Sequence, residues 1–409
     1  MYVSPPDEEI ESKKSVVDYK KSVSRRGVLA ELYQSEVSTL AQLAKSLHSS
    51  VPSITNIVEE LVNEKWVSTF GTAVGNHGRR PVLFGLNVQD KYVVALDIST
   101  HDTKVVIMNL QREVIFRKDI KLGLEDNPRF AKALLEFTRQ ALEESQVEAS
   151  HFVAIGISMP GLIQFQTGTN MTYRRINQEE KPLSTLISEE FNLPVFVIND
   201  TKATVLGEHR FGLARGKKHV LAINIDWGVG LGIILNGEIF QGASGFAGEL
   251  GHIQMDPDGE LCHCGKVGCL DTITSARSLI RRVQRGLNEG RVSKLSAYMD
   301  HIEDIDIEMI IEAALEGDAF AIDILFDVGT VLGKGLSMAV HLFNPEIVIV
   351  DGIVVKADQF ITNPIGQAIN KYCLSDFRND LSIEISQLGE RAKWIGIHIY
   401  VMDQLLATI

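Results

Sequence analysis

Apolar residues recur at helical spacing through the first part of the chain. They predict three short helices, over residues 24–33, 39–47 and 52–63. Ser38 has the residue type of an N-cap for the second helix, and Pro52 suits the first turn of the third, where its missing N–H costs nothing. Residues 1–20 are charged and poor in aromatic residues, so a disordered tail is expected there.

Two short β runs, at 66–70 and 82–84, follow these helices and flank a Gly-rich basic tip. This order is typical of a winged helix-turn-helix DNA-binding domain, here over residues 21–90, with the third helix reading bases and the tip reaching phosphates or a minor groove. A helical hairpin used for dimerisation is the alternative interpretation. The expected DNA-contacting residues are Val51, Ser53, Thr55, Asn56, Arg79 and Arg80.

After residue 91 the pattern changes to buried strands that alternate with helices. Helices are predicted near 129–144, across 305–343 and at 391–409. Several strands end in a cluster of Gly, Asn or Asp, which is typical of an open α/β sheet that binds ligands at its strand ends. The predicted strands are 92–98, 104–110, 113–118, 152–158, 195–198 and 347–350, with another beginning at 219.

Charge and length narrow the class of protein. The 409 residues suggest two or three domains, and the net charge of −13 argues against a nucleic-acid coat protein. However, residues 13–91 carry 11 Lys and Arg against 7 Asp and Glu, which is typical of a DNA-reading head on an acidic body. No apolar run approaches the roughly 18 residues of a membrane span, and the polar N-terminus is unlike a signal peptide, so a cytoplasmic protein is expected.

One His and three Cys lie close together in the segment 245–271. Cys262, Cys264 and Cys269 have C-x-C-x4-C spacing, and His252 precedes them by ten residues. Three thiols and an imidazole form a complete tetrahedral set for a structural zinc ion, with no position left for an activated water. Three separate buried thiols are the alternative, which clustering beside two glycines disfavours. The remaining Cys373 is interpreted as a buried thiol.

The body resembles the ROK family, named for repressor, open reading frame and kinase, and within it the xylose- and N-acetylglucosamine-type repressors. The matching motifs are SMPG at 158–161, ND at 199–200, GVGLG at 228–232, GELGH at 248–252 and CHCGKVGCLD at 262–271. The resemblance implies a two-lobe, actin-like, hexokinase-type body that closes on a sugar. Lobe I would comprise 91–199 plus 391–409, and lobe II, with the zinc loop, 200–390.

The resemblance also implies a sugar site in the cleft between the lobes. Asp200 corresponds to the base of the kinases, and His252 would bond a sugar hydroxyl while its other ring nitrogen binds zinc. Asp271 stands where the family usually has Glu, so its sugar contact would be weaker or water-mediated. The implied sugar-binding residues are Pro160, Gly161, Asn199, Asp200, Glu249, His252 and Asp271.

Three loops that hold nucleotide phosphates in the kinases of this family differ here. Bulky residues replace glycines in the segment 97–103, Asp226 and Trp227 replace a Gly-Thr pair, and Asp351 replaces a glycine. Phosphoryl transfer needs glycines and backbone N–H groups around the phosphates, and a carboxylate there repels them. No catalytic residue is therefore expected, and Asp200 would be catalytic only in a kinase.

A sugar site without a nucleotide site, joined to a DNA-binding head, predicts a sugar-responsive transcriptional regulator. It would be a repressor of carbohydrate uptake or catabolism genes, acting as a homodimer or homotetramer on operator DNA. A sugar or sugar phosphate in the cleft would change operator affinity. Two alternatives stay open: an ATP-dependent sugar kinase with an accessory head, and a repressor controlled by a partner protein.

Overall fold

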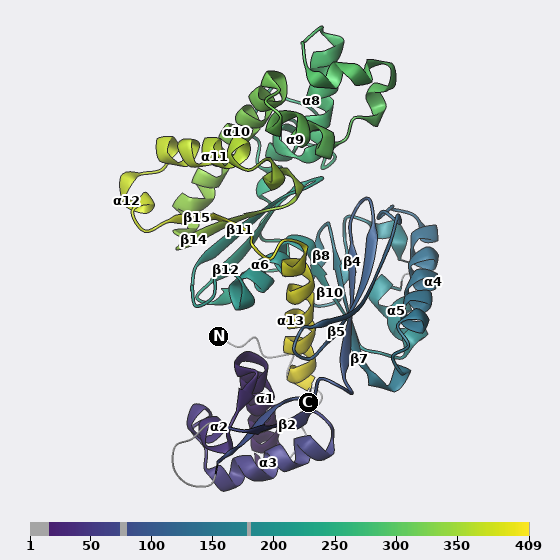
Figure 1. Cartoon of the computed structure of the whole chain (residues 1–409), viewed down its shortest axis with the longest axis vertical. Helices are drawn as coiled ribbons and strands as arrows, with labels where there is room; N and C mark the ends of the chain where they lie inside the picture. Colours follow the sequence, from purple (N-terminus) through teal and green to yellow (C-terminus); the bar gives the residue numbers. More distant parts are fainter. Residues whose placement is uncertain (1–15, 74–79, 178–180, 409) are drawn as a thin grey trace.

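The computed structural model describes residues 16–73, 80–177 and 181–408. The chain forms three connected parts: a small head, lobe I and lobe II (Figure 1). The head packs three helices on a three-stranded antiparallel sheet of order β1-β3-β2. Its buried core includes Leu29, Leu43, Ile54 and Leu61. The elements are α1 (Val16–Ser35), β1 (Val37–Ser38), α2 (Leu40–Ser46), α3 (Val51–Asn63), β2 (Val67–Thr72) and β3 (Val82–Leu86).

Two details of the head differ from the sequence-based expectations. The first helix begins at Val16, so residues 16–20 are helical rather than part of a disordered tail, because no Gly or Pro interrupts residues 16–26. The N-cap of α2 is Thr39, which forms a capping box with Gln42, whereas Ser38 lies in β1. The expected tail at 1–15 and Arg79 lie outside the described residues.

Lobe I is a five-stranded sheet of order β10-β7-β4-β5-β6, in which β4, β7 and β10 are parallel. Helices α4 (Pro128–Glu144) and α5 (Leu183–Phe191) cover one face, and α13 (Glu390–Thr408) covers the other. A small hairpin, β8 (Ile163–Gln164) and β9 (Thr169–Asn170), follows β7. The strands are β4 (Tyr92–Ile98), β5 (Thr103–Asn109), β6 (Val114–Ile120), β7 (Phe152–Met159) and β10 (Val195–Asn199), which confirms the predicted strands to within two residues.

Lobe II repeats this plan with a sheet of order β13-β12-β11-β14-β15. Its strands are β11 (Val220–Ile225), β12 (Val229–Leu235), β13 (Glu238–Ile239), β14 (Ile347–Asp351) and β15 (Ser382–Ile385). The predicted helical segment 305–343 is confirmed, but it breaks in two at Gly317, whose φ is +86°. The helices are α7 (Leu270–Thr274), α8 (Ala276–Asn288), α9 (Ile307–Leu315), α10 (Ala319–Phe343), α11 (Gln359–Tyr372) and α12 (Ser375–Arg378).

The helix α6 (Asp200–Phe211) lies between the lobes and packs closely along α13. A Cβ atom on Gly396 of α13 would overlap the carbonyl oxygen of Ala203, and one on Gly207 of α6 would overlap that of Ala392. Glycine is therefore required at both positions, because the two helix backbones touch there. Figure 1 shows α13 running from the junction of the lobes toward the head.

The head contacts the body through buried side chains around Tyr33 of α1. The Tyr33 carbonyl accepts from Nη1 of the buried Arg112 of the body at 3.2 Å. The Tyr33 hydroxyl lies 2.7 Å from Nδ1 of His398 in α13, and the Tyr33 ring packs edge-on against Phe211 of α6. Burial lowers the pKa of His398 to about 3, so the imidazole is neutral. Its Nε2–H then donates to the Asn109 carbonyl at 3.0 Å, and Nδ1 accepts from Tyr33. A cavity of about 450 Å³ lies beside this joint, lined by Tyr33, Phe211 and the basic Arg215.

Within the described residues, every helix is too short or too polar to cross a lipid bilayer.

Gly396→Ala should destabilise the folded chain, because the new methyl group would push the α6 and α13 backbones apart. We expect the free energy of unfolding to fall by about 3 kcal/mol in chemical denaturation. Gly366→Ala in α11 is the control, since a Cβ there meets no atom within 4 Å, and it should be neutral or stabilising. Equal stability of the two variants would contradict backbone contact between the helices.

Candidate functional site

The carboxyl ends of the parallel strands carry polar residues in both lobes. In lobe I, Asp97 of β4 pairs with Ser158 of β7, and the end of β7 pairs with Asn199 of β10. In lobe II, Asp351 ends β14 beside Asn224 of the parallel strand β11. Ligand sites of open α/β sheets lie at such strand ends.

The side chain of Asn199 forms hydrogen bonds with the backbone at the start of α6. Its Oδ1 accepts from the N–H groups of Thr201 and Lys202, at 3.0 and 3.2 Å, and its Nδ2 donates to the Gly161 carbonyl at 3.2 Å. The side chain therefore caps α6 and ties it to the loop after β7. The sequence pattern indicated a ligand contact at Asn199, which stays a prediction. The contact that the structure shows is the cap of α6.

Asp200 is the first residue of α6. Its Oδ1 accepts from the Thr201 N–H at 2.8 Å, and burial raises the pKa of its carboxyl group despite the opposing charge of Lys393. A half-buried carboxyl group at a helix N-terminus is suited to bonding a ligand hydroxyl.

Pro160 and Gly161 form a turn held by a buried asparagine. The Pro160 carbonyl accepts from Asn170 Nδ2 at 2.9 Å, while Asn170 Oδ1 accepts from the N–H groups of Thr172 and Tyr173, each at 3.0 Å. Gly161 has φ +102°, which a side chain would strain. Asn170 has no signature in the sequence, because it acts through a hairpin whose pairing is visible only in three dimensions.

Glu249 and His252 lie on a short segment that crosses β12. A Cβ on Gly248 would overlap the Leu231 carbonyl, and one on Gly251 the Val229 carbonyl, so both glycines are required by close backbone approach. This places Glu249 Oε2 3.8 Å from His252 Nε2. Burial raises the pKa of Glu249, and the charge of the buried Lys202 opposes that rise.

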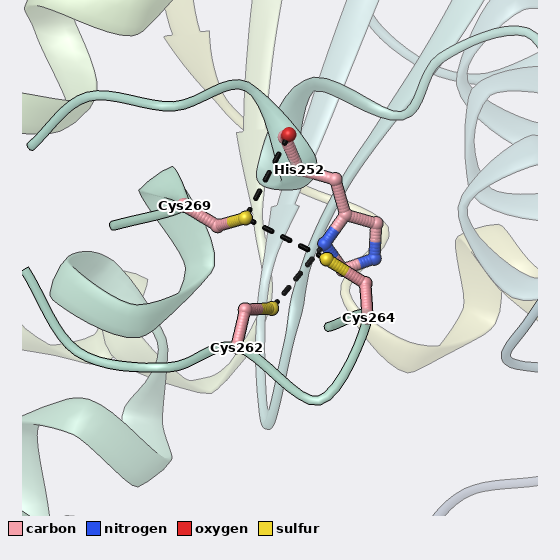
Figure 2. Close-up of side chains that lie close together, drawn as sticks. All are labelled: His252, Cys262, Cys264 and Cys269. Atoms are coloured by element: carbon pink, nitrogen blue, oxygen red, sulfur yellow. Dashed lines mark hydrogen bonds between the residues drawn. The ribbon is translucent and has the colours of Figure 1, made fainter. Parts of the chain in front are cut away.

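The four predicted metal ligands converge in space (Figure 2). Cys262 Sγ lies 3.6 Å from His252 Nδ1, Cys264 Sγ lies 3.7 Å from Cys269 Sγ, and all four ligand atoms lie within 4.8 Å of one another. A tetrahedron with Zn–S bonds of about 2.3 Å and a Zn–N bond of about 2.05 Å has edges of about 3.8 and 3.6 Å. The residues therefore fit a tetrahedral metal ion, with Nδ1 of His252 facing it and Nε2 turned toward Glu249.

Asp271 lies two residues after Cys269, and its side chain contacts strand β12 of the same lobe. Its Oδ1 accepts from the Val229 N–H at 2.9 Å, and its Oδ2 lies 4.0 Å from His263 Nδ1. Cys262, His263 and Asp271 form a second group with possible metal-ligand geometry, but it shares Cys262 with the four-residue set, which alone supplies a full tetrahedron.

The two altered loops of residues 97–103 and 226–232 meet through an aromatic stack. The rings of His101 and Trp227 are parallel to within 17°, with centroids 3.6 Å apart. Burial lowers the pKa of His101. The two rings therefore join a loop of lobe I to a loop of lobe II.

On the head, the expected DNA-contacting residues line the outer face of α3. Val51, Ser53 and Asn56 are exposed, and Thr55 is half-buried, with its hydroxyl donating to the Val51 carbonyl at 2.9 Å. Arg80 is exposed just before β3. The opposite face of α3 is buried in the head.

Comparison with known proteins agrees with these motifs. The model of the ROK family matches residues 93–404. The chain is 29% identical over 393 residues to the DNA-binding transcriptional dual regulator NagC of Escherichia coli, covering 96% of this chain and 95% of that protein. It is 27% identical over 391 residues to the xylose repressor of Bacillus subtilis, covering 95% and 97%.

Solved structures resemble the whole chain or the body. A ROK family transcriptional regulator, a homologue of the E. coli Mlc protein, has a TM-score of 0.81 and 28% identity, covering 96% of this chain and 99% of that one. A ROK family glucokinase from Streptomyces griseus, solved with glucose and AMPPNP, has a TM-score of 0.66 and 26% identity, covering 75% and 98%. With its two-lobe α/β body and a family model that spans most of its length, this chain belongs to the ROK family.

Proposed function

We propose that the protein is a sugar-responsive, DNA-binding transcriptional repressor of carbohydrate uptake or catabolism genes. The observation that carries the proposal is the joint at Tyr33, which docks a helical head onto the two helices that reach the cleft. The repressors named above match nearly the full length of the chain, head included. Operator DNA would be bound by a homodimer or homotetramer, because paired half-sites require two heads.

The head is proposed to be a winged helix-turn-helix domain. The exposed face of α3, with Ser53 and Asn56 near its start, would enter the major groove, and the basic tip between β2 and β3 would reach phosphates or the minor groove. Arg80 supports the role of the tip by its exposure.

A sugar is proposed to bind at the cleft beside Asp200 and Glu249, with His252 Nε2–H as a donor. The polar set suits vicinal hydroxyls of a hexose, an N-acetylated amino sugar or a phosphorylated form. Asp271 is the weakest member of the set, because its Oδ1 already accepts the Val229 N–H. Pro160 and Gly161 would form the floor of the site.

The proposed protein binds sugar without phosphorylating it. The His101–Trp227 stack lies between two loops that hold phosphates in the kinases, and the carboxyl groups of Asp226 and Asp351 would repel nucleotide phosphates. The likeness to a glucokinase favours one alternative, an ATP-dependent sugar kinase with Asp200 as its base. Nucleotide binding distinguishes the two functions.

Zinc is the proposed metal of the His252 and cysteine cluster, since thiolates with one imidazole at tetrahedral spacing suit zinc. A metal on Nδ1 would fix the His252 ring so that Nε2 carries the proton and faces Glu249. The zinc ion would thus be structural and would orient the sugar-binding segment.

The helix α6 gives the proposed route from sugar to DNA. Asp200 begins the helix at the cleft, and Phe211 ends it against Tyr33, about 18 Å away for 12 residues. A sugar that favours one arrangement of the lobes would move α6 and α13 together, because their backbones touch. The head would then reorient and operator affinity would change.

Calorimetric titration tests the sugar site. We expect a hexose or amino sugar to bind the native protein without ATP–Mg²⁺, and Glu249→Ala to weaken that binding by about 1.5–3 kcal/mol, the value of a hydrogen bond to a charged group. Glu143→Ala, on the exposed side of α4, is the control. ATP binding with sugar turnover would instead establish the kinase.

Operator binding tests the head. Asn56→Ala should reduce the preference for operator over random DNA, whereas Arg80→Ala should weaken binding to all sequences and reduce the salt slope by about 1. Arg139→Ala on α4 provides a matched loss of charge away from the head. An unchanged salt slope for Arg80→Ala would remove that residue from the interface.

Metal analysis tests the zinc. We expect one zinc ion per native chain, and Cys264→Ala should release it, lower the melting temperature by about 10 °C and abolish the sugar response. Cys373→Ala, a buried cysteine outside the cluster, should retain the metal. Native protein without zinc would contradict the assignment.

A further inference from the structure

A single lysine side chain reaches into the cleft from the mostly apolar helix α13. Lys393 Nζ lies 3.4 Å from Asp97 Oδ1, and the side chains are 18% and 5% exposed. The neighbouring Trp394 Nε1 donates to Asp97 Oδ2 at 3.1 Å. Among the described residues Asp97 Oδ1 has no hydrogen-bond partner, so the ammonium group of Lys393 is its stabilising neighbour.

Lys393 interacts electrostatically with four carboxyl groups. Burial lowers its pKa, but Asp97, Asp200, Asp226 and Asp351 together raise it above the usual value, so the amine is protonated. Three of these acids come from the three loops that correspond to the phosphate loops of the kinases, and Asp200 comes from the sugar side. The lysine therefore pairs directly with Asp97 of lobe I, and its charge acts on carboxyl groups of both lobes.

A nearby cation stabilises the charged form of a carboxyl group that is partly removed from water. Burial raises the pKa of Asp226 and of Asp200, and raises the pKa of Asp351 to about 6. In each case the charge of Lys393 opposes the rise. Lys104 is a second cation near this group, but its ion pairs are with Asp102, at 2.9 Å, and Glu390, at 3.3 Å.

We propose that Lys393 is a built-in counter-ion of the cleft, which takes the place that a divalent cation with its nucleotide would otherwise occupy among these acids. The lysine opposes the effect of burial on Asp200 and so favours its charged form, and its ion pair with Asp97 holds α13 against β4. The cleft thus binds sugar independently of Mg²⁺ and nucleotide. This inference rests on the proposed sugar-binding function and names a residue that positions the site.

The position of Lys393 on α13 gives the counter-ion a second effect. His398, which accepts from Tyr33 of the head, lies five residues further along the same helix, about 7.5 Å away. A ligand that moves Asp200 away from Lys393 would weaken the electrostatic attraction between them. Because Lys393 belongs to α13, this helix would then shift close to its contact with the head. Lys393 therefore influences operator affinity as well as sugar affinity.

The test compares the full-length, zinc-loaded native protein with Lys393→Met, by titration with Mn²⁺ alone and with the sugar that binds the native protein. We expect Mn²⁺ to bind the cleft of Lys393→Met and not that of the native protein. Sugar affinity should fall about tenfold in this variant and be partly restored by Mn²⁺, and Lys393→Arg should retain most of it. Lys104→Met is the control and should change sugar affinity far less.

Two outcomes overturn the proposal: unchanged sugar affinity in Lys393→Met, or equal Mn²⁺ binding by both proteins. If Lys393→Met does not fold, the double variant Asp97→Asn with Lys393→Met should recover the fold, because it removes the unpaired buried charge. Failure of the double variant to fold would also count against the proposal. If the native protein binds no sugar, the proposed function fails, while the Mn²⁺ comparison still decides the role of Lys393.

Discussion

Backbone contact between α6 and α13 is the constraint on which the rest of the molecule depends. Two glycines, Gly207 and Gly396, allow it, and any side chain there would separate the helices. The helix α6 packs on the sheet of lobe II, and α13 packs on the sheet of lobe I, so the pair forms the layer between the two sheets. Because protein interiors are close-packed, a shift of one helix must move the other.

The pattern of apolar residues was sufficient to predict most of the fold. Strand β4 and helix α3 lie where the apolar residues indicated, since β4 is buried on both faces and α3 buries one face at helical spacing. The N-cap of α2 was harder to predict, because Ser38 and Thr39 are both good N-cap residues. Only the backbone conformation in the folded chain shows that Thr39 is the cap. The cluster of candidate metal ligands was predictable because Cys262, Cys264 and Cys269 are neighbours in the chain, and their convergence with His252 follows from a short loop.

Contacts between distant segments could not be predicted from local patterns. Tyr33 and His398 are 365 residues apart, and either one taken alone is an ordinary buried side chain of a helix. Lys393 gave no signal, because it follows the charged Glu390 and Arg391 at the start of a helix, and its partner Asp97 is nearly 300 residues earlier. Asn199 illustrates the opposite limit: its motif indicated ligand binding, whereas its capping bonds to α6 appear only in three dimensions.

The separation of Tyr33 from His398 also has a consequence for biosynthesis. The head emerges from the ribosome before the body, and its three helices pack on one another, so it can fold while the body is still being translated. Its docking surface is incomplete until residues 390–408 of α13 have been made and have packed against α6. A nascent or truncated chain would therefore carry a folded head with no fixed orientation. Control by sugar would begin only when translation has passed the last helix.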